Sequence, residues 1–268
     1  MSKLRNLGVK GWKGAFFIAT IIYVFIAISK ISAFKQIDLD INNILLDVFS
    51  NINLESNNMM FNYSSYIINY VIISYVYGNY ISEDLKKNSI YIFTRTADKN
   101  KWVNKKVLDL FFFVSIYVVL EISVSLIVLF ASGFRIINIY NFIIVLFSIM
   151  LNLIVNFIIV ILIANIVSIK FSDIIGYTIS LIIFSLSILL TYILNMLMIS
   201  GEYYRYIPFV NSITSWYSVF NNIVNRNINN ISFFMGNHSF IICILIAGVV
   251  IFILQVAIRK IINNMDIL

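Results

Sequence analysis

One acidic side chain, Glu121, stands in the middle of a long apolar stretch of the sequence. At the centre of a membrane helix such a charge costs about 2.5–3.5 kcal/mol on insertion scales. Glu121 must therefore be protonated, paired or in contact with water. Ser125 follows four residues later, on the same face of a helix. The pair predicts either a contact for a substrate or a proton, or a polar clamp between helices.

Two further apolar stretches carry polar residues at intervals of four, which places them on one face of a helix. They are Ser148, Asn152 and Asn156 in one stretch, and Ser187, Thr191 and Asn195 in the other. Side chains of these types form hydrogen bonds between membrane helices, typically worth about 0.6 kcal/mol each. The two stripes predict either such interhelical bonds or the wall of a pathway for an amphiphilic substrate.

The motifs of common catalytic centres are missing from the sequence. It contains no Walker A motif, and no G-x-S-x-G or H-E-x-x-H motif. The chain has one histidine and one cysteine, so it offers few metal ligands and no internal disulfide. We expect no catalytic residue, no metal site and no cofactor on this chain.

Composition places the chain in a membrane. Hydrophobic residues make up 61% of it and charged residues only 12%, whereas soluble domains average about 25% charged residues. The mean hydropathy is +0.94. So few charges can cover the ends of a bundle whose sides lie in lipid, but not the surface of a soluble particle. The net charge of +7 fits an excess of Lys and Arg on the cytoplasmic side, and we expect no nucleic-acid partner.

Six apolar stretches are long enough to cross a bilayer, which takes roughly 17–25 residues. They span residues 14–34, 64–81, 107–132, 141–167, 174–200 and 240–258. Each is continuous rather than alternating, and a backbone in lipid is satisfied only by helices and closed barrels. The sequence therefore predicts an all-α integral membrane protein, with residues 1–268 forming a single transmembrane domain.

The basic residues predict the orientation of this bundle. In this arrangement, 14 of the 19 Lys and Arg residues lie on one side, and the positive-inside rule makes that side cytoplasmic. Both termini are then cytoplasmic. Residues 2–12 predict an amphipathic helix on the cytoplasmic face. The segment 35–63, which carries Asp38, Asp40, Asp47 and Glu55, is expected to be an external loop. The aromatic-rich segment 201–239 is also external, and its part 212–228 is expected to form helices in the outer leaflet.

The cytoplasmic connection between the second and third spans, residues 82–106, is both charged and amphipathic. It contains the residues that we expect to form its surface: Glu83, Asp84, Leu85, Ile90, Phe93, Arg95, Trp102 and Lys105. Such a mixture predicts a surface that binds another protein, or one that lies on anionic lipid.

The connection resembles that of the permease subunits of type 2 ABC exporters. In that family an acidic residue follows the second span, a short helix leads to an Arg, and a Trp–Lys stretch opens the third span. The corresponding residues here are Glu83, Arg95, Trp102, and Lys105 or Lys106. Thr94 stands where the family usually has a proline. The six spans, the amphipathic start and the aromatic outer segment extend the resemblance over nearly the whole chain.

The resemblance implies a coupling helix that docks on a separate ABC ATPase dimer, which would hold ATP and Mg. A second permease copy or a homologous permease would complete a transporter that exports an amphiphile. The resemblance is to small permeases from the plasma membrane of AT-rich Gram-positive bacteria that remove antimicrobial peptides such as lantibiotics. Lipid, glycan and drug export stay open, as do the choice of homodimer or heterodimer and the direction of transport.

Two other classes of function remain as alternatives. A gradient-driven transporter or channel would use Glu121 as its ion site, although such carriers usually have several buried charges. A membrane-embedded enzyme is the third alternative, with few residues to support it.

Overall fold

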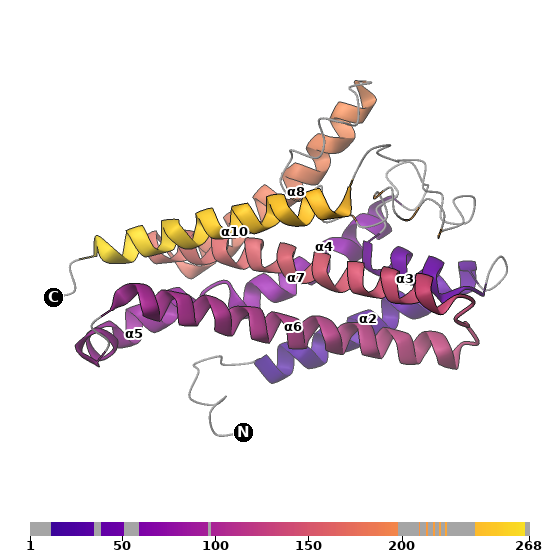
Figure 1. Cartoon of the computed structure of the whole chain (residues 1–268), viewed down its shortest axis with the longest axis horizontal. Helices are drawn as coiled ribbons and strands as arrows, with labels where there is room; N and C mark the ends of the chain where they lie inside the picture. The colour runs from indigo at the N-terminus through magenta and orange to yellow at the C-terminus, as the bar shows by residue number, and fades with distance from the viewer. Residues whose placement is uncertain are drawn as a thin grey trace.

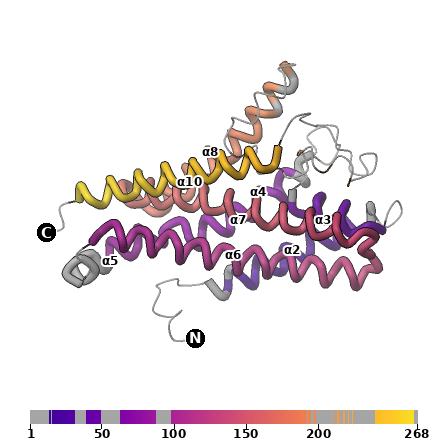
Figure 2. The backbone as a smooth tube through the Cα atoms, in the orientation of Figure 1, coloured from indigo at the N-terminus to yellow at the C-terminus, as the bar shows by residue number. Residues whose placement is uncertain are grey.

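The computed structural model describes residues 12–34, 39–50, 59–95, 98–197 and 239–265, together with the single positions 209, 213, 217, 220 and 223. The regular elements of this described part are all helices (Figures 1 and 2). They are α2 (Trp12–Phe34), α3 (Ile41–Ser50), α4 (Met59–Tyr77), α5 (Tyr80–Arg95), α6 (Lys99–Ala131), α7 (Ile139–Lys170), α8 (Asp173–Met196) and α10 (Phe240–Asn263).

The helices form an elongated bundle. In Figure 1, α6, α7 and α10 run along its long axis. Helix α5 lies at the end of the bundle where α10 ends, and α3 lies at the opposite end. Helix α8 starts within the bundle, and its far end points away from it.

Helix α7 is the core of the bundle, because it contacts α3, α4, α5, α6, α8 and α10. Seven consecutive side chains, from Asn156 to Leu162, are buried, so that no side of this stretch faces outward. A helix that is apolar all round is expected to be surrounded by other helices. The absence of charges from this part of the sequence thus matches its central position.

The surrounding helices expose large apolar side chains. Phe112 and Ile127 of α6 and Leu245 and Phe252 of α10 are each more than 60% exposed. In water this exposure would cost about 25 cal/mol per Å², so the bundle requires an apolar solvent. By length and composition, four described helices can cross a membrane: α6, α7, α10, and α8 over Asp173–Thr191. These helices support the prediction of a multi-pass helical membrane protein.

The other two predicted spans correspond to α2 and α4. The apolar part of α2, Phe16–Ile31, is shorter than the four long helices. Helix α4 ends at Tyr77, before the predicted limit of 81, because the chain turns at Gly78 and Asn79.

Helix α6 begins well before the predicted third span, which started at residue 107. Asp98 is its N-cap and accepts hydrogen bonds from the backbone N–H groups of Asn100 at 3.0 Å and Lys101 at 3.1 Å. Trp102 and Lys105 therefore belong to the first turns of α6 and not to the connection that precedes it.

Helix α3 lies inside the segment 35–63, for which an external loop was predicted. Every side chain from Ile41 to Phe49 is buried. Asp47 of α3 forms an ion pair with Lys30 of α2 at 2.8 Å, and the N–H group of Ile41 donates to the carbonyl oxygen of Arg135 at 3.1 Å. These contacts explain how a segment with polar residues packs within the bundle. The predicted helix at residues 2–12, except for its last residue, and most of the segment 212–228 lie outside the described residues.

Candidate functional site

The corner between α4 and α5 is closed by Asn165 of α7, which is fully buried. Its side-chain oxygen accepts a hydrogen bond from the N–H group of Ile81 at 2.7 Å. Its side-chain nitrogen donates to the carbonyl oxygens of Tyr77 at 3.0 Å and Ile161 at 2.8 Å. The last carbonyls and the first N–H groups of helices lack partners within their own helix. Asn165 thus supplies one partner to the end of α4 and one to the start of α5.

Two glycines allow close packing around the same face of α7. A Cβ atom on Gly176 of α8 would lie 1.9 Å from Oγ of Ser168 and 2.6 Å from the carbonyl oxygen of Ala164. A Cβ atom on Gly78 would lie 2.3 Å from the carbonyl oxygen of Ser74 and 3.2 Å from Cβ of Ala164. Small residues allow membrane helices to approach closely. Helix α8 and the α4–α5 corner therefore both rest directly on α7.

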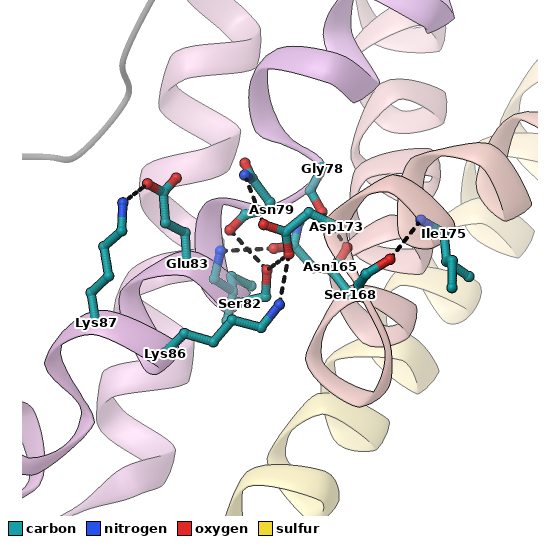
Figure 3. Close-up of polar contacts among 12 residues, drawn as sticks. Gly78, Asn79, Ser82, Glu83, Lys86, Lys87, Asn165, Ser168, Asp173 and Ile175 are labelled. Carbon is teal, nitrogen blue, oxygen red and sulfur yellow. Dashed lines mark hydrogen bonds and ion pairs between the residues drawn. The ribbon is translucent and has the colours of Figure 1, made fainter.

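Asp173, the first residue of α8, gathers three donors from this corner (Figure 3). Its carboxylate accepts hydrogen bonds from Asn79 at 3.4 Å and Ser82 at 3.2 Å, and forms an ion pair with Lys86 at 2.9 Å. A carboxylate at the N-terminus of a helix is also favoured by the helix dipole. Asp173 thus ties α5 to the start of α8.

Lys106 ties the same part of α5 to α6. Its ammonium group pairs with Asp84 at 2.8 Å, and the lysine is only 8% exposed. The ammonium group also lies 4.3 Å from the ring centroid of Tyr80 and 5.8 Å from that of Trp102. These distances are within the range of cation–π interactions. Through Asn165, Asp173 and Lys106, α5 is bound to α7, α8 and α6.

We refer to Tyr77, Gly78, Asn79, Ile81, Ser82, Asp84, Lys86, Lys106, Asn165 and Asp173 as the α5 corner. Of the residues predicted for the coupling surface, Leu85 of α5 and Trp102 of α6 are buried, at 7% and 8% exposure. Glu83 pairs with Lys87 on the same helix, and Lys105 is exposed. Ile90, Phe93 and Arg95 lie on α5, but their side chains lie outside the described part.

A second group of polar side chains lies buried in the middle of the bundle. Tyr117, Glu121 and Ser125 follow one another at intervals of four on α6, and Tyr23 faces them from α2. All four are at most 3% exposed. The hydroxyl groups of Tyr23 and Tyr117 lie close enough to the carboxyl group of Glu121 to interact with it. We call these four residues the Glu121 cluster.

Although the hydroxyl groups of Tyr23 and Tyr117 approach the carboxyl group of Glu121, these contacts lack the geometry of hydrogen bonds. Both carboxyl oxygens of Glu121, the hydroxyl groups of Tyr23 and Tyr117, and that of Ser125 lack a partner among the described residues. Leaving a buried polar group without a partner costs about 1–3 kcal/mol. Two of the predicted states of Glu121 are thus compatible with the described residues. Its carboxyl group is either protonated or paired with a group that does not belong to these residues.

The polar stripe of α7 lies at the same depth as this cluster. The rings of Tyr117 and Phe157 are in contact, with centroids 6.1 Å apart. Because α6 and α7 run in opposite directions, Glu121 is level with the turn of α7 that carries Asn152 and Asn156. Asn156 donates to the backbone and side-chain oxygens of Asn152 at 2.8 and 2.9 Å. Ser148, one turn further, is also buried.

The described hydroxyl groups of the polar stripe on α8 donate hydrogen bonds to carbonyl oxygens of the same helix. The hydroxyl group of Ser187 donates to the carbonyl oxygen of Ile183 at 2.8 Å, and that of Thr191 to the carbonyl oxygen of Ser187 at 2.9 Å. The side chain of Asn195 lies outside the described residues. Both described hydroxyl groups thus form their hydrogen bonds within α8.

Several residues of these two regions were not predicted as site residues from the sequence. Asn165 has a detectable signal, because it is the only polar residue in the apolar run 157–167. Tyr117 could have been found by extending the four-residue spacing of Glu121 and Ser125 by one step. Tyr23 and Asp173 carry no such signal, because only the packing of helices brings them to their partners.

Among the described residues, no group of three or more His, Cys, Asp or Glu side chains is placed to hold a metal ion. No family model, no curated protein and no solved structure matches this chain.

Proposed function

We propose that this chain is the permease subunit of an ABC exporter and that α5 is the helix through which a separate ATPase drives it. The observation that carries the proposal is the α5 corner. A charged helix at one end of an apolar bundle is joined by polar contacts to α6, α7 and α8. A force applied to α5 would therefore be transmitted to three long helices.

The finer features of the proposal follow from the sequence. The bundle has six spans, formed by α2, α4, α6, α7, α8 and α10, with both termini in the cytoplasm. ATP and Mg bind to the partner ATPase dimer, and a second permease completes the transporter. The cargo is an amphiphile, with an antimicrobial peptide as the first candidate class. The membrane is the plasma membrane of a Gram-positive bacterium.

The direct test is affinity purification of the tagged full-length chain from its native membranes in mild detergent. We expect an ATPase with a Walker A motif to copurify. If no ATPase is present in the purified complex, the proposal is wrong.

A charge exchange on α5 tests the surface itself. Glu83 and Lys87 form an exposed pair within the helix. Lys87→Glu is expected to reduce the captured ATPase about tenfold, because it inverts a charge at the contact. The double variant with Glu83→Lys restores the pair within α5 but leaves the surface altered, so it controls for helix stability. Lys170→Glu, at the exposed end of α7, controls for a general change in charge.

A gradient-driven carrier is the second candidate, and it is favoured by the carboxyl group of Glu121, which has no hydrogen-bond partner among the described residues. Transport into inverted vesicles separates the two functions. Dependence on ATP in the presence of a protonophore supports the exporter. Dependence on the proton gradient without ATP supports the carrier.

A further inference from the structure

The Glu121 cluster concentrates acceptor oxygens in a place where no cation of the described chain reaches them. The buried lysines of the described part are Lys30 and Lys106. They are already paired with Asp47 and Asp84, respectively. Glu121 is thus a buried carboxyl group for which the described residues supply no counter-ion. A buried charge is tolerated only where it is paired or coordinates a ligand.

The composition of the cluster restricts the cation that it can bind. A single carboxyl group with three hydroxyl groups matches one positive charge. Calcium takes six to eight oxygen ligands, usually including several carboxylates, and transition metals prefer His or Cys, which the cluster does not contain.

Aromatic rings pack against both tyrosines of the cluster, and such surroundings favour an organic cation. The ring of Phe16 lies 5.1 Å from that of Tyr117, and the ring of Phe49 lies 5.1 Å from that of Tyr23, measured between centroids. Ammonium groups bind well over aromatic faces, and the hydroxyl groups of both tyrosines can accept hydrogen bonds from an N–H donor. The site therefore fits the ammonium end of a larger molecule.

The cluster lies next to a helix whose other face is exposed. Tyr23 belongs to α2 and the other three residues to α6, so the cluster lies between these two helices. The opposite face of α2 is open, with Phe17 and Phe25 more than 60% exposed. Helix α2 packs mainly on α3, α4 and α6. A separation of α2 from α6 would expose the oxygens while an apolar tail stays in lipid.

We propose that the Glu121 cluster binds the ammonium group of a cationic amphiphile between α2 and α6. The role of this molecule as cargo rests on the proposed export function, but its binding does not. The inference thus names the charge of the cargo and the side chain that recognises it.

Binding is tested on the purified full-length chain in nanodiscs of phosphatidylcholine, without any ATPase. Octylammonium chloride is the probe, 1-octanol is the neutral control, and sodium chloride tests for a metal ion, all at constant ionic strength. The readout is the thermal unfolding midpoint as a function of probe concentration, because a ligand that binds the folded state raises it.

We expect octylammonium to raise the midpoint and octanol and sodium to leave it unchanged. Glu121→Gln keeps the shape of the side chain but removes its charge, and should weaken the apparent affinity at least about tenfold. Tyr117→Phe should weaken it about threefold, as the loss of one hydrogen bond predicts. Asp109→Asn removes another carboxylate of α6, and Ser123→Ala removes a hydroxyl group from its outer face, so both should bind as the natural chain does.

The proposal is overturned if Glu121→Gln binds octylammonium within about twofold of the natural chain. It is also overturned if sodium, and not octylammonium, stabilises the chain in a way that depends on Glu121, because the site would then bind a metal ion. Failure of ATPase capture would leave this result unchanged, so the two proposals fail independently.

Discussion

At the α5 corner, the amide group of Asn165 uses both its donor and its acceptor, with bonds of 2.7–3.0 Å to two other helices and to its own. In the middle of α6, neither carboxyl oxygen of Glu121 has a hydrogen-bond partner among the described residues. Both side chains are almost completely buried, at 0% and 3% exposure. Nearly equal burial thus occurs for an amide group with all its hydrogen bonds and for a carboxyl group without a partner among the described residues.

The difference separates polar groups that hold the structure from polar groups that are available to a ligand. A satisfied buried network rigidifies the elements that it joins, whereas an unsatisfied one lowers stability. Sites of function are often less stable than the structure would allow. If this distinction is correct, substitutions in the two regions should change the free energy of unfolding in opposite directions.

The largest effect is expected for Asn165→Leu. The substitution leaves the N–H group of Ile81 and the carbonyl oxygen of Tyr77 buried without their partner, which we expect to lower the free energy of unfolding by about 3 kcal/mol. Denaturant titration in mixed micelles measures this change in the free energy of unfolding. Asn156→Leu is the matched control, because Asn156 donates its hydrogen bonds to Asn152 of the same helix. An equal loss in both variants would show that Asn165 has no special role at the corner.

Gly176→Ala should lower the free energy of unfolding by about 2 kcal/mol, as overpacking of a close contact does. The new Cβ atom would meet Ser168 and the backbone of Ala164, so α8 would have to move away from α7. Gly248→Ala is the control, because a Cβ atom there has no atom within 4 Å. Comparable midpoints for the two variants would contradict the close packing of α8 on α7.

Glu121→Met should act in the opposite direction and raise the free energy of unfolding by about 1 kcal/mol. It replaces a buried carboxyl group without a hydrogen-bond partner by an apolar side chain of similar length, which removes the cost of burying that group. The same titration measures it, at a pH where other carboxylates are ionised. A loss of more than about 1 kcal/mol would mean that the carboxyl group holds the helices together, and the comparison with Asn165 would fail.

The smallest effect is expected for Asp173→Asn. The ion pair with Lys86 is partly exposed, with relative side-chain exposures of 36% and 45%, so its contribution should be below about 1 kcal/mol. Salt should reduce it further, because exposed pairs are screened. Lys86→Met and the double variant complete a double-mutant cycle. A coupling that persists at 1 M salt would contradict a surface ion pair.

The positions of the long helices could be predicted from the sequence alone. Apolar runs of about 20 residues have few ways to satisfy their backbone in lipid, and the four long helices overlap the predicted spans closely. The candidate site was predicted less completely. Glu121 and Ser125 stood out because a polar residue in an apolar run is conspicuous, whereas Tyr23 looks like any other aromatic residue of α2.

Boundaries and connections were harder to predict. The apolar run 64–81 continues through the end of α4, so composition does not reveal the turn at Gly78 that Asn165 stabilises. Residues 41–49 contain Asn and Asp side chains and suggested an external loop, yet they are all buried. The charged residue among them, Asp47, can be buried because it forms an ion pair with Lys30 of α2.

The sequence by itself determined that this chain is a set of membrane helices, because transfer of apolar surface depends on composition and run length and not on neighbours. Only the tertiary structure decided which buried polar groups have partners. A hydrogen bond or ion pair requires two atoms within about 3 Å, and that distance depends on how separate helices pack. The packing of the helices therefore decides that Asn165 has hydrogen-bond partners and that Glu121 has none among the described residues.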